Sequence, residues 1–259
     1  MSIVLITGCS RGIGRTVAED LTRRGHQVIA TARRGDDLSG LDVAQHLQLD
    51  VSDDTSVQEA ADQLDHVDVL INNAGIALQA PLEHTPVDAA AALFDINVFG
   101  VLRTTRAFLP ALRRSEAGLV INVSSVVGRI AFPLVGVYSA SKFALEAISE
   151  TLALETQDQG IRVSVLEPGY VSSGGVERSA TYFPDDMSKY GRLVEALQSS
   201  TSSSSTPQEV ADTVADIVEG RQTAFRVPVG ESANALLSAR SELDDEQFAG
   251  ALRANLNLA

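Results

Sequence analysis

Residues 3–14, "IVLITGCSRGIG", decide the fold of this 259-residue chain. Their first part is a continuous apolar run, which is typical of a strand buried on both faces of a parallel sheet. Glycines at positions 8, 12 and 14 then lead into residues 14–24, whose apolar residues have helical spacing. Glycine lets a backbone approach a phosphate closely, and a helix N-terminus supplies free N–H groups and positive potential. The stretch therefore predicts a strand, a phosphate-binding turn and a helix.

Strand-like and helix-like segments alternate along the chain beyond this turn. Further strands are expected at residues 26–32, 46–50, 67–75, 118–125, 161–169 and 224–229. Helices are expected at residues 51–64, with Ser52 as N-cap, and at 87–113, 137–160, 207–220 and 232–259. This alternation predicts an α/β fold, a doubly wound parallel sheet with helices on both faces, formed by one domain over residues 1–259.

Residues 170–206 depart from the alternation, because they are polar and end in a run of serines. The serine run alone is typical of a solvated linker. The larger segment follows the carboxyl end of a predicted strand, where open α/β sheets bind their ligands. We therefore predict that residues 170–206 form a mobile substrate lid.

The composition excludes several classes of function. A net charge of −14 argues against general binding to nucleic acid or to anionic membranes, since both need a basic face. No apolar run is long enough to span a membrane, and no signal peptide is recognisable, so a cytoplasmic location is expected. Cys9 is the single cysteine, and the four histidines lack metal-ligand spacing, so no metal site is expected.

Ser125, Tyr138 and Lys142 are the residues that point most strongly to chemistry. Tyr138 and Lys142 are four positions apart at the start of a predicted helix, so they share one face. An ammonium group favours phenolate and would lower the tyrosine pKa from about 10, which suits general acid or base catalysis near neutral pH. Ser125 ends a predicted strand, where its hydroxyl can hydrogen-bond a substrate carbonyl. On these residues alone, a Tyr–Lys pair on a helix surface remains an alternative.

The sequence motifs, taken together, resemble those of the short-chain dehydrogenase/reductase family. "TGCSRGIG" (residues 7–14), "NNAG" (72–75), "NVSS" (122–125), "YSASK" (138–142) and "EPG" (167–169) occur in the order and spacing of its single-domain members. Each motif is weak alone, but five in register are specific, and the strong match covers about residues 3–173. The resemblance implies a Rossmann-like sheet of seven parallel strands and hydride transfer between a nicotinamide cofactor and a carbonyl or alcohol carbon.

The resemblance also implies catalytic roles. Tyr138 would donate the proton in ketone reduction, and Lys142 would bind the nicotinamide ribose and lower the Tyr138 pKa. Ser125, rather than the adjacent Ser124, would polarise the carbonyl. Asn97, in "FDINVFG", matches the asparagine that holds a water for proton relay.

A larger set of residues is expected to bind the cofactor. Besides Tyr138 and Lys142, it comprises Gly8, Ser10, Arg11, Gly12, Ile13, Gly14, Arg33, Arg34, Asp50, Val51, Asn73, Ala74, Gly75, Pro168, Gly169, Val171 and Ser173. The family often has threonine where this chain has Ser173, and serine keeps the hydroxyl.

The cofactor is expected to be NADP(H). Ala32 stands where NAD-preferring members carry an aspartate that would repel a 2′-phosphate. Arg33 follows, and a guanidinium can hold a phosphate through two parallel hydrogen bonds. Arg11 occupies a second position where basic residues mark NADP-preferring members. For Arg34, a purely solvated role stays open.

The substrate is expected to be a partly apolar ketone or aldehyde, because an apolar loop at residues 130–137 separates Ser125 from Tyr138. Phe132, Val135, Tyr170 and Phe183 are the expected substrate contacts, with core packing or an oligomer contact as an equal alternative. Apolar residues on several faces of the Tyr–Lys helix predict a homodimer or homotetramer; they are Leu145, Ile148, Leu152 and Leu154.

Two other classes of protein on this scaffold are alternatives to a reductase. A cofactor-free dehalogenase would replace the lysine with arginine and lose the glycine turn, and both features are intact here. A catalytically inactive NADP(H)-binding regulator would keep the glycine turn without needing Ser125, Tyr138 and Lys142 together. All three are present, which favours an active carbonyl reductase.

Overall fold

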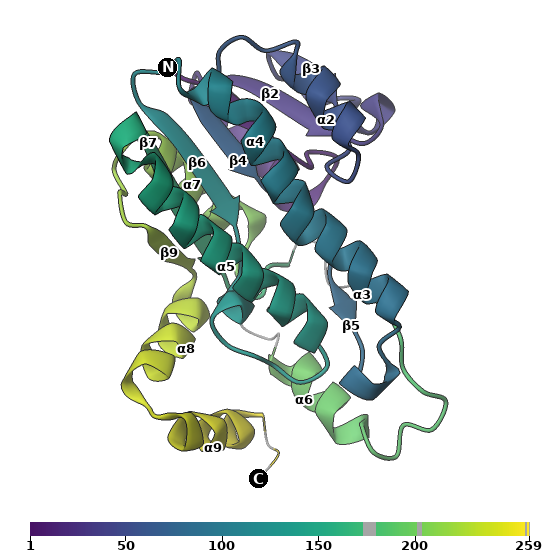
Figure 1. Ribbon diagram of the computed structural model, residues 1–259. Coiled ribbons are helices and arrows are strands. Elements are labelled where there is room, and N and C mark those ends of the chain that lie inside the picture. Colours follow the sequence, from purple (N-terminus) through teal and green to yellow (C-terminus); the bar gives the residue numbers. More distant parts are fainter. Residues whose placement is uncertain (173–179, 201–203, 257, 259) are drawn as a thin grey trace.

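The centre of the molecule is a seven-stranded sheet with the strand order β3-β2-β1-β4-β6-β7-β9 (Figure 1). The computed structural model describes residues 1–172, 180–200, 204–256 and 258. Neighbouring strands pair in parallel throughout this sheet. The strands are β1 (Ile3–Ile6), β2 (Gln27–Ala32), β3 (Gln45–Gln48), β4 (Val69–Asn72), β6 (Gly118–Val123), β7 (Ile161–Pro168) and β9 (Arg226–Val229). The predicted doubly wound parallel sheet is confirmed.

Helices cover both faces of the sheet (Figure 1). On one face lie α1 (Gly12–Arg23) and α7 (Pro207–Val218), and on the other lie α2 (Asp54–Ala61), α4 (Gly100–Leu112) and α5 (Gly136–Thr156). Leu21 and Val214 contribute to the first apolar core, and Phe108 and Leu152 to the second. All six residues of β6 are buried, which explains why the strands appear as continuous apolar runs.

The N-cap of α2 is Asp53, and the prediction of Ser52 was wrong by one residue. The Asp53 side chain accepts hydrogen bonds from the backbone N–H groups of Thr55 and Ser56. The Ser52 hydroxyl instead donates to the Asp50 carboxylate at 2.7 Å. Both residues are good cap formers, and the nearby acceptor on Asp50 decides between them.

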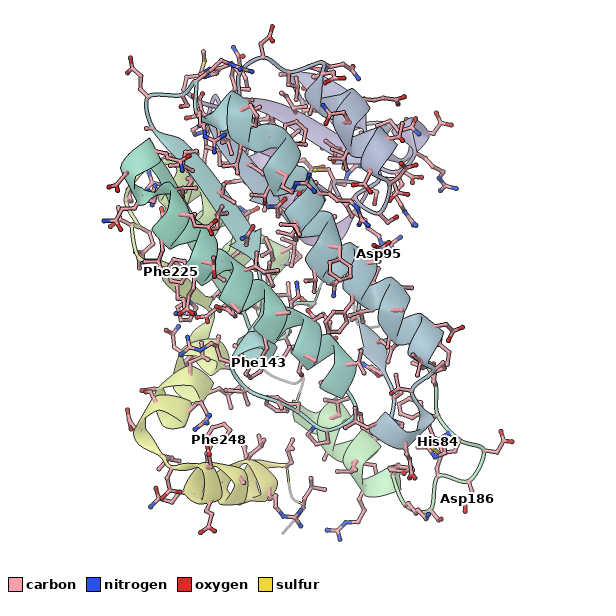
Figure 2. The ribbon with its side chains drawn as sticks, in the orientation of Figure 1. His84, Asp95, Phe143, Asp186, Phe225 and Phe248 are labelled. Carbon is pink, nitrogen blue, oxygen red and sulfur yellow. The ribbon has the colours of Figure 1, made fainter. Side chains whose placement is uncertain are left out.

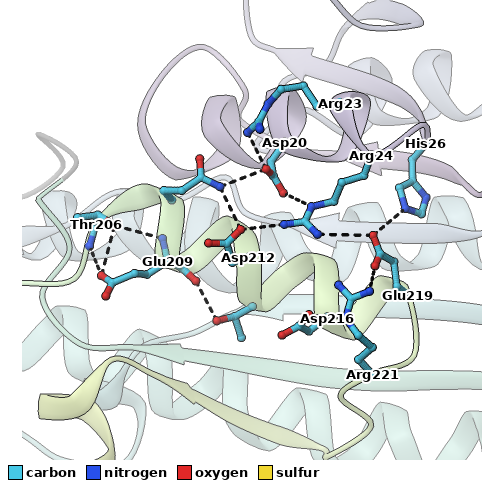
Figure 3. A network of polar contacts seen from close by, with 12 residues as sticks. Asp20, Arg23, Arg24, His26, Thr206, Glu209, Asp212, Asp216, Glu219 and Arg221 are labelled. Atoms are coloured by element: carbon cyan, nitrogen blue, oxygen red, sulfur yellow. Dashed lines mark hydrogen bonds and ion pairs between the residues drawn. The ribbon is translucent and has the colours of Figure 1, made fainter.

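An ion network around the buried Asp20 joins α1 to α7 (Figure 3). Asp20 on α1 is 2% exposed and accepts hydrogen bonds of 2.6 Å from both Arg23 and Arg24. Arg24 also bonds to Asp212 on α7 at 2.8 Å. A buried carboxylate is tolerated where its charge is paired and its lone pairs are filled. The network therefore fixes the helix that begins directly after the predicted lid.

The predicted helix at residues 87–113 is interrupted by a wider turn. It consists of α3 (Val87–Phe94), a π-helical turn (Asp95–Phe99) and α4. A π-turn inserts one extra residue and re-aims the side chains around it, and such turns are frequent at functional sites. Asn97 lies in this turn.

Part of the predicted lid is regular structure. A short strand, β8 (Ala180–Thr181), pairs with β5 (Leu78–Gln79), and α6 (Gly191–Ser200) follows. The Tyr190 ring meets the ring of His84, which is labelled in Figure 2, edge-on with 5.8 Å between the ring centres. Residues 173–179 and 201–203 lie outside the described part. The linker prediction was wrong for Ser205, which is buried and pairs with Val171.

The chain ends in two helices, α8 (Glu231–Glu242) and α9 (Asp245–Asn255), which extend from the end of β9 (Figure 1). The predicted helical tail is thus confirmed over the described residues.

Short 3₁₀ turns lie at Gly35–Leu38, Leu82–His84, Val126–Gly128 and Gln157–Gln159. Among the helices of the described residues, none combines the length and the apolar character that crossing a bilayer requires.

Candidate active site

The predicted motifs meet at the carboxyl-terminal edge of the sheet. From β1 the chain builds outward to β2 and β3 on one side, and from β4 to β6 and β7 on the other. Such a reversal of strand order leaves a crevice at the carboxyl ends, where open α/β sheets bind ligands. The glycine turn follows β1, "NNAG" closes β4, and Ser125 comes two residues after β6.

The glycine turn has a backbone that other residues would strain. Gly8 and Gly12 have φ angles of +76° and +59°, in the left-handed region that favours glycine. A Cβ on Gly14 would lie 2.4 Å from the carbonyl oxygen of Gly8. Arg11 precedes α1 without capping it through its side chain. The first N–H groups of α1 thus remain available for an anion such as a pyrophosphate.

The "NNAG" turn is bonded to the glycine turn. Asn73 Nδ2 donates to the carbonyl oxygens of Thr7 and Gly8 at 2.9 and 3.1 Å. Thr7 Oγ1 accepts from the backbone N–H groups of Asn73 and Ala74, at 3.0 Å each. Thr7 is therefore a further residue that shapes the site, and no sequence pattern had marked it.

Ser125, Tyr138 and Lys142 lie together, as predicted. Tyr138 and Lys142 occupy the first turns of α5, with Lys142 Nζ 5.8 Å from the centre of the Tyr138 ring. Tyr138 forms a hydrogen bond with Ser125, whose hydroxyl also donates to the Pro168 carbonyl at 3.2 Å. Lys142 Nζ donates to the carbonyl of Val123, at the end of β6, at 2.8 Å.

Burial raises the pKa of Tyr138 to about 12, and its hydrogen bond with Ser125 acts in the opposite direction. Burial also lowers the pKa of Lys142 to about 8, against the opposing effect of the Glu146 charge. Lys142 is not among the causes of the Tyr138 shift, and its ammonium donates to the Val123 carbonyl; its predicted effect on the Tyr138 pKa stays a prediction. Tyr138 therefore keeps its proton at neutral pH, the form a proton donor needs.

Asn97 is 1% exposed and lies next to these residues. Its Oδ1 accepts from the backbone N–H of Ile76, and its Nδ2 donates to the Ile76 carbonyl, both at 2.9 Å. Nδ2 also donates to Ser141 Oγ on α5 at 3.2 Å. Asn97 thus ties α5 to the segment that follows "NNAG", and the π-turn that places it was missed by sequence reasoning.

Basic side chains gather where β2 ends. Ala32 is buried, while Arg33 and Arg34 are exposed. Arg34 bonds to Asp37 through Nη2 at 2.8 Å and Nε at 3.2 Å. The pKa of Asp37 is lowered by this hydrogen bond first, and also by the charges of Arg33 and Arg11. Arg34 therefore contacts this carboxylate, and the charges of Arg33 and Arg11 reach it from the same end of the sheet.

The other residues predicted to bind the cofactor lie along the same edge. Asp50 and Val51 follow β3, where Val51 is buried and would be 2.9 Å from a Cβ on Gly100. Ser10 and Ile13 are half-buried in the glycine turn, and Gly75 lies beside Asn97. The Gly169 N–H donates to the Val229 carbonyl at 3.4 Å. Ser173 lies outside the described residues.

The predicted substrate residues come from two segments that flank Tyr138. Phe132 and Val135 are half-buried in the loop after Ser125, and Tyr170 and Phe183 are half-buried in the lid segment. Leu134 in the same loop has a φ angle of +66°, and its carbonyl accepts from the Ala80 N–H at 2.8 Å. This conformation costs roughly 1 kcal/mol for a residue with a Cβ and is held here by the bond to Ala80.

Comparison with known proteins gives a consistent result. The family model described as "short chain dehydrogenase" matches residues 2–182. A 3-ketodihydrosphingosine reductase from Bacteroides thetaiotaomicron is 32% identical over 261 residues, covering 97% of this chain and 96% of the relative.

Solved structures match over almost the whole chain. A short-chain dehydrogenase from Streptomyces avermitilis is 33% identical with a TM-score of 0.82, covering 98% of this chain and 97% of that one. One from Burkholderia cenocepacia, in complex with NADP, is 29% identical with a TM-score of 0.81 over 98% and 97%. One from Burkholderia phymatum, in complex with NAD, is 26% identical with a TM-score of 0.77 over 93% and 92%.

Proposed function

Because the chain belongs to the short-chain dehydrogenase family, we propose that it is an NADP(H)-dependent reductase of a partly apolar ketone or aldehyde. The observation that carries this proposal is the grouping of Ser125, after β6, with Tyr138 and Lys142 on the first turns of α5. The reverse reaction, alcohol oxidation, uses the same groups.

In the proposed mechanism, NADPH supplies the hydride to the carbonyl carbon when it is bound. Ser125 donates a hydrogen bond to the carbonyl oxygen, which stabilises the negative charge that develops there. Tyr138 passes its phenolic proton to that oxygen, so that the alcohol forms and a phenolate remains. Lys142 holds the ribose hydroxyls and stabilises the phenolate until solvent returns a proton.

The residues present fit a dinucleotide. The close packing of Gly14 against Gly8 holds the shape of the glycine turn, and the start of α1 offers N–H groups that no side chain caps. The preference for NADP(H) is supported by Arg11 and Arg33, whose charges act on the same small region beside Asp37. Ala32 adds to it, because it removes the acid that would repel a 2′-phosphate.

The substrate proposal is supported by the half-buried apolar side chains of the loop after Ser125 and of the lid segment. It agrees with the name of the Bacteroides relative, which is a reductase of a keto compound.

The test is an NADPH and NADH oxidation assay against a panel of ketones and aldehydes that runs from sugars to long-chain and aryl compounds. We expect turnover with NADPH, highest for compounds with large apolar groups. Turnover confined to small polar sugars would overturn the substrate class. Binding of NADPH without turnover of any carbonyl would favour the inactive regulatory protein.

We also propose a homodimer or homotetramer that pairs through α4 and α5. The prediction that Leu145 and Leu152 contribute was wrong, because both are buried in the core of one chain. Phe143 and Leu154 on α5 are 45% and 76% exposed. Phe99, in the π-turn before α4, and Leu102, on α4, are exposed as well. Sedimentation that shows only a monomer at micromolar concentration would refute this assembly.

A further inference from the structure

Glu146 is a buried acid that the mechanism above does not use. It lies one helical turn beyond Lys142 on α5 and is 4% exposed. Its Oε2 accepts a hydrogen bond of 2.9 Å from Arg226 on β9. Its Oε1 is buried and has no hydrogen-bond partner among the described residues. Burying a carboxylate with one oxygen unpartnered costs free energy, so a nearby positive charge is expected to offset that cost.

The unpartnered oxygen faces the turn that carries Ser125. A Cβ on Gly128 would lie 3.2 Å from Glu146 Oε1 and 2.7 Å from Ser124 Oγ, another buried atom without a partner among the described residues. Ser125 begins this turn, and its carbonyl accepts from the Gly128 N–H at 2.8 Å. Glycine at position 128 thus lets the Glu146 carboxylate approach the catalytic turn closely.

Several charged groups surround this carboxylate. Arg226 on β9 is shared with Glu150 on α5, which it bonds at 2.9 Å and which is exposed. Glu167 on β7 is 1% exposed and pairs with Arg129, which follows the turn, at 3.3 Å. Tyr138 is the remaining titratable group beside Lys142 and is uncharged at neutral pH.

Lys142 itself has only a neutral hydrogen-bond acceptor, the Val123 carbonyl, among the bonds described above. The nearest acid on its own face of α5 is Glu146, since residues four apart on a helix are neighbours. Both side chains are more than nine-tenths buried, where an opposite charge acts with little screening.

We propose that Glu146 is a positioning residue, whose buried carboxylate keeps Lys142 as an ammonium in the active site. The effect of Glu146 on catalysis rests on the proposed function, whereas its effect on the charge of Lys142 does not. In support, burial lowers the pKa of Lys142 to about 8 and the Glu146 charge opposes that change. Without Glu146, Lys142 would lose its proton closer to neutral pH.

The first experiment is the pH dependence of kcat/KM for the wild type, Glu146→Gln and Glu150→Gln. Glu150 is the matched control, because it bonds the same arginine from the same helix but is exposed and one turn farther from Lys142. We expect Glu146→Gln to move the alkaline limb of the kcat/KM profile about one pH unit lower. At an alkaline pH where the wild type is still fully active, kcat/KM of the variant should therefore be about tenfold lower. Glu150→Gln should leave the limb unchanged. An unshifted limb in Glu146→Gln would overturn the proposal.

A second experiment does not depend on turnover. Melting temperatures of the wild type, Lys142→Met, Glu146→Gln and the double variant form a double-mutant cycle. At pH 7, Glu146→Gln should lower the melting temperature about 3 °C more when Lys142 is present than in the Lys142→Met background. The difference should vanish at pH 10, where Lys142 has lost its proton. Equal losses in both backgrounds at pH 7 would mean that Glu146 is structural only.

The cycle also separates the two proposals and allows for poor folding. If the wild type reduces no carbonyl but the cycle shows coupling, the proposed function fails and the charge pair stands. If Glu146→Gln alone does not fold, the double variant should fold better, because the lysine charge is then removed as well. A double variant that folds no better than Glu146→Gln would contradict the proposal.

Discussion

The ammonium of Lys142 donates to the carbonyl of Val123 at 2.8 Å and lies 5.8 Å from the centre of the Tyr138 ring. The lysine is therefore anchored to the end of β6, the strand that leads to Ser125, rather than to the tyrosine oxygen. Tyr138 is half-buried, and desolvation raises its pKa.

Ser125 is expected to be the serine that polarises the carbonyl. Ser125→Ala should lower kcat about 100- to 1,000-fold, as for the loss of one donor to a developing oxyanion. The affinity for NADPH, measured by fluorescence titration, should change little. Ser124→Ala is the matched control, since Ser124 is also buried but its hydroxyl contacts no described partner. Equal losses in both variants would contradict the assignment.

The arginines at the end of β2 are expected to select the cofactor. Changing Ala32→Asp together with Arg33→Ile should lower the ratio of kcat/KM for NADPH to that for NADH about 30-fold, because a charge-assisted hydrogen-bond pair contributes about 2 kcal/mol. Arg34→Ala should have a smaller effect, since Arg34 is bonded to Asp37 and is exposed. An unchanged ratio in the double variant would show that these arginines do not hold a phosphate.

The close packing of the glycine turn predicts a severe effect of one methyl group. Gly14→Ala should destabilise the protein by about 2 kcal/mol or more and abolish NADPH binding, because the new Cβ meets the backbone of Gly8. Gly250→Ala on α9 is the control, since nothing lies within 4 Å of its Cβ position. Urea denaturation measures the stability of both variants, and fluorescence titration measures their NADPH binding. A Gly14→Ala variant with wild-type stability would show that the turn has room to relax.

The stability of the protein should depend on the charge of Glu167. Burial, helped by repulsion from Glu146, raises the pKa of this carboxyl group above its ordinary value of 4.5, against the effect of Arg129 and Arg226. The folded form then binds more protons than the unfolded form, so stability falls as pH rises through the raised pKa. Glu167→Gln should therefore raise the melting temperature at pH 8 and bring no gain at pH 4. A variant less stable than wild type at pH 8 would contradict this sign.

The sequence was sufficient to predict the sheet and that Ser125, Tyr138 and Lys142 lie together at its carboxyl edge. Apolar runs such as residues 3–6 mark strands buried on both faces, and the turns after them mark the carboxyl edge of the sheet. Parallel topology then brings Ser125 and Pro168 together, although they are far apart in the chain.

Other features depend on contacts that no local pattern encodes. The π-turn at Asn97 is fixed by bonds to Ile76 and Ser141 from two distant segments. Desolvation raises the pKa of Tyr138, an effect of tertiary packing that its spacing to Lys142 does not encode. The pairing of β5 with β8 joins two residues of each strand, which is too short for a period to be visible.

The central claim is tested most directly by steady-state NADPH oxidation with the best carbonyl substrate of the panel, comparing the wild type with Tyr138→Phe. The variant keeps the ring and loses the phenolic hydroxyl, and with it the proton that is to be donated. We predict a fall in kcat of about 100- to 10,000-fold with NADPH affinity unchanged. Turnover by Tyr138→Phe at the wild-type rate would contradict the account.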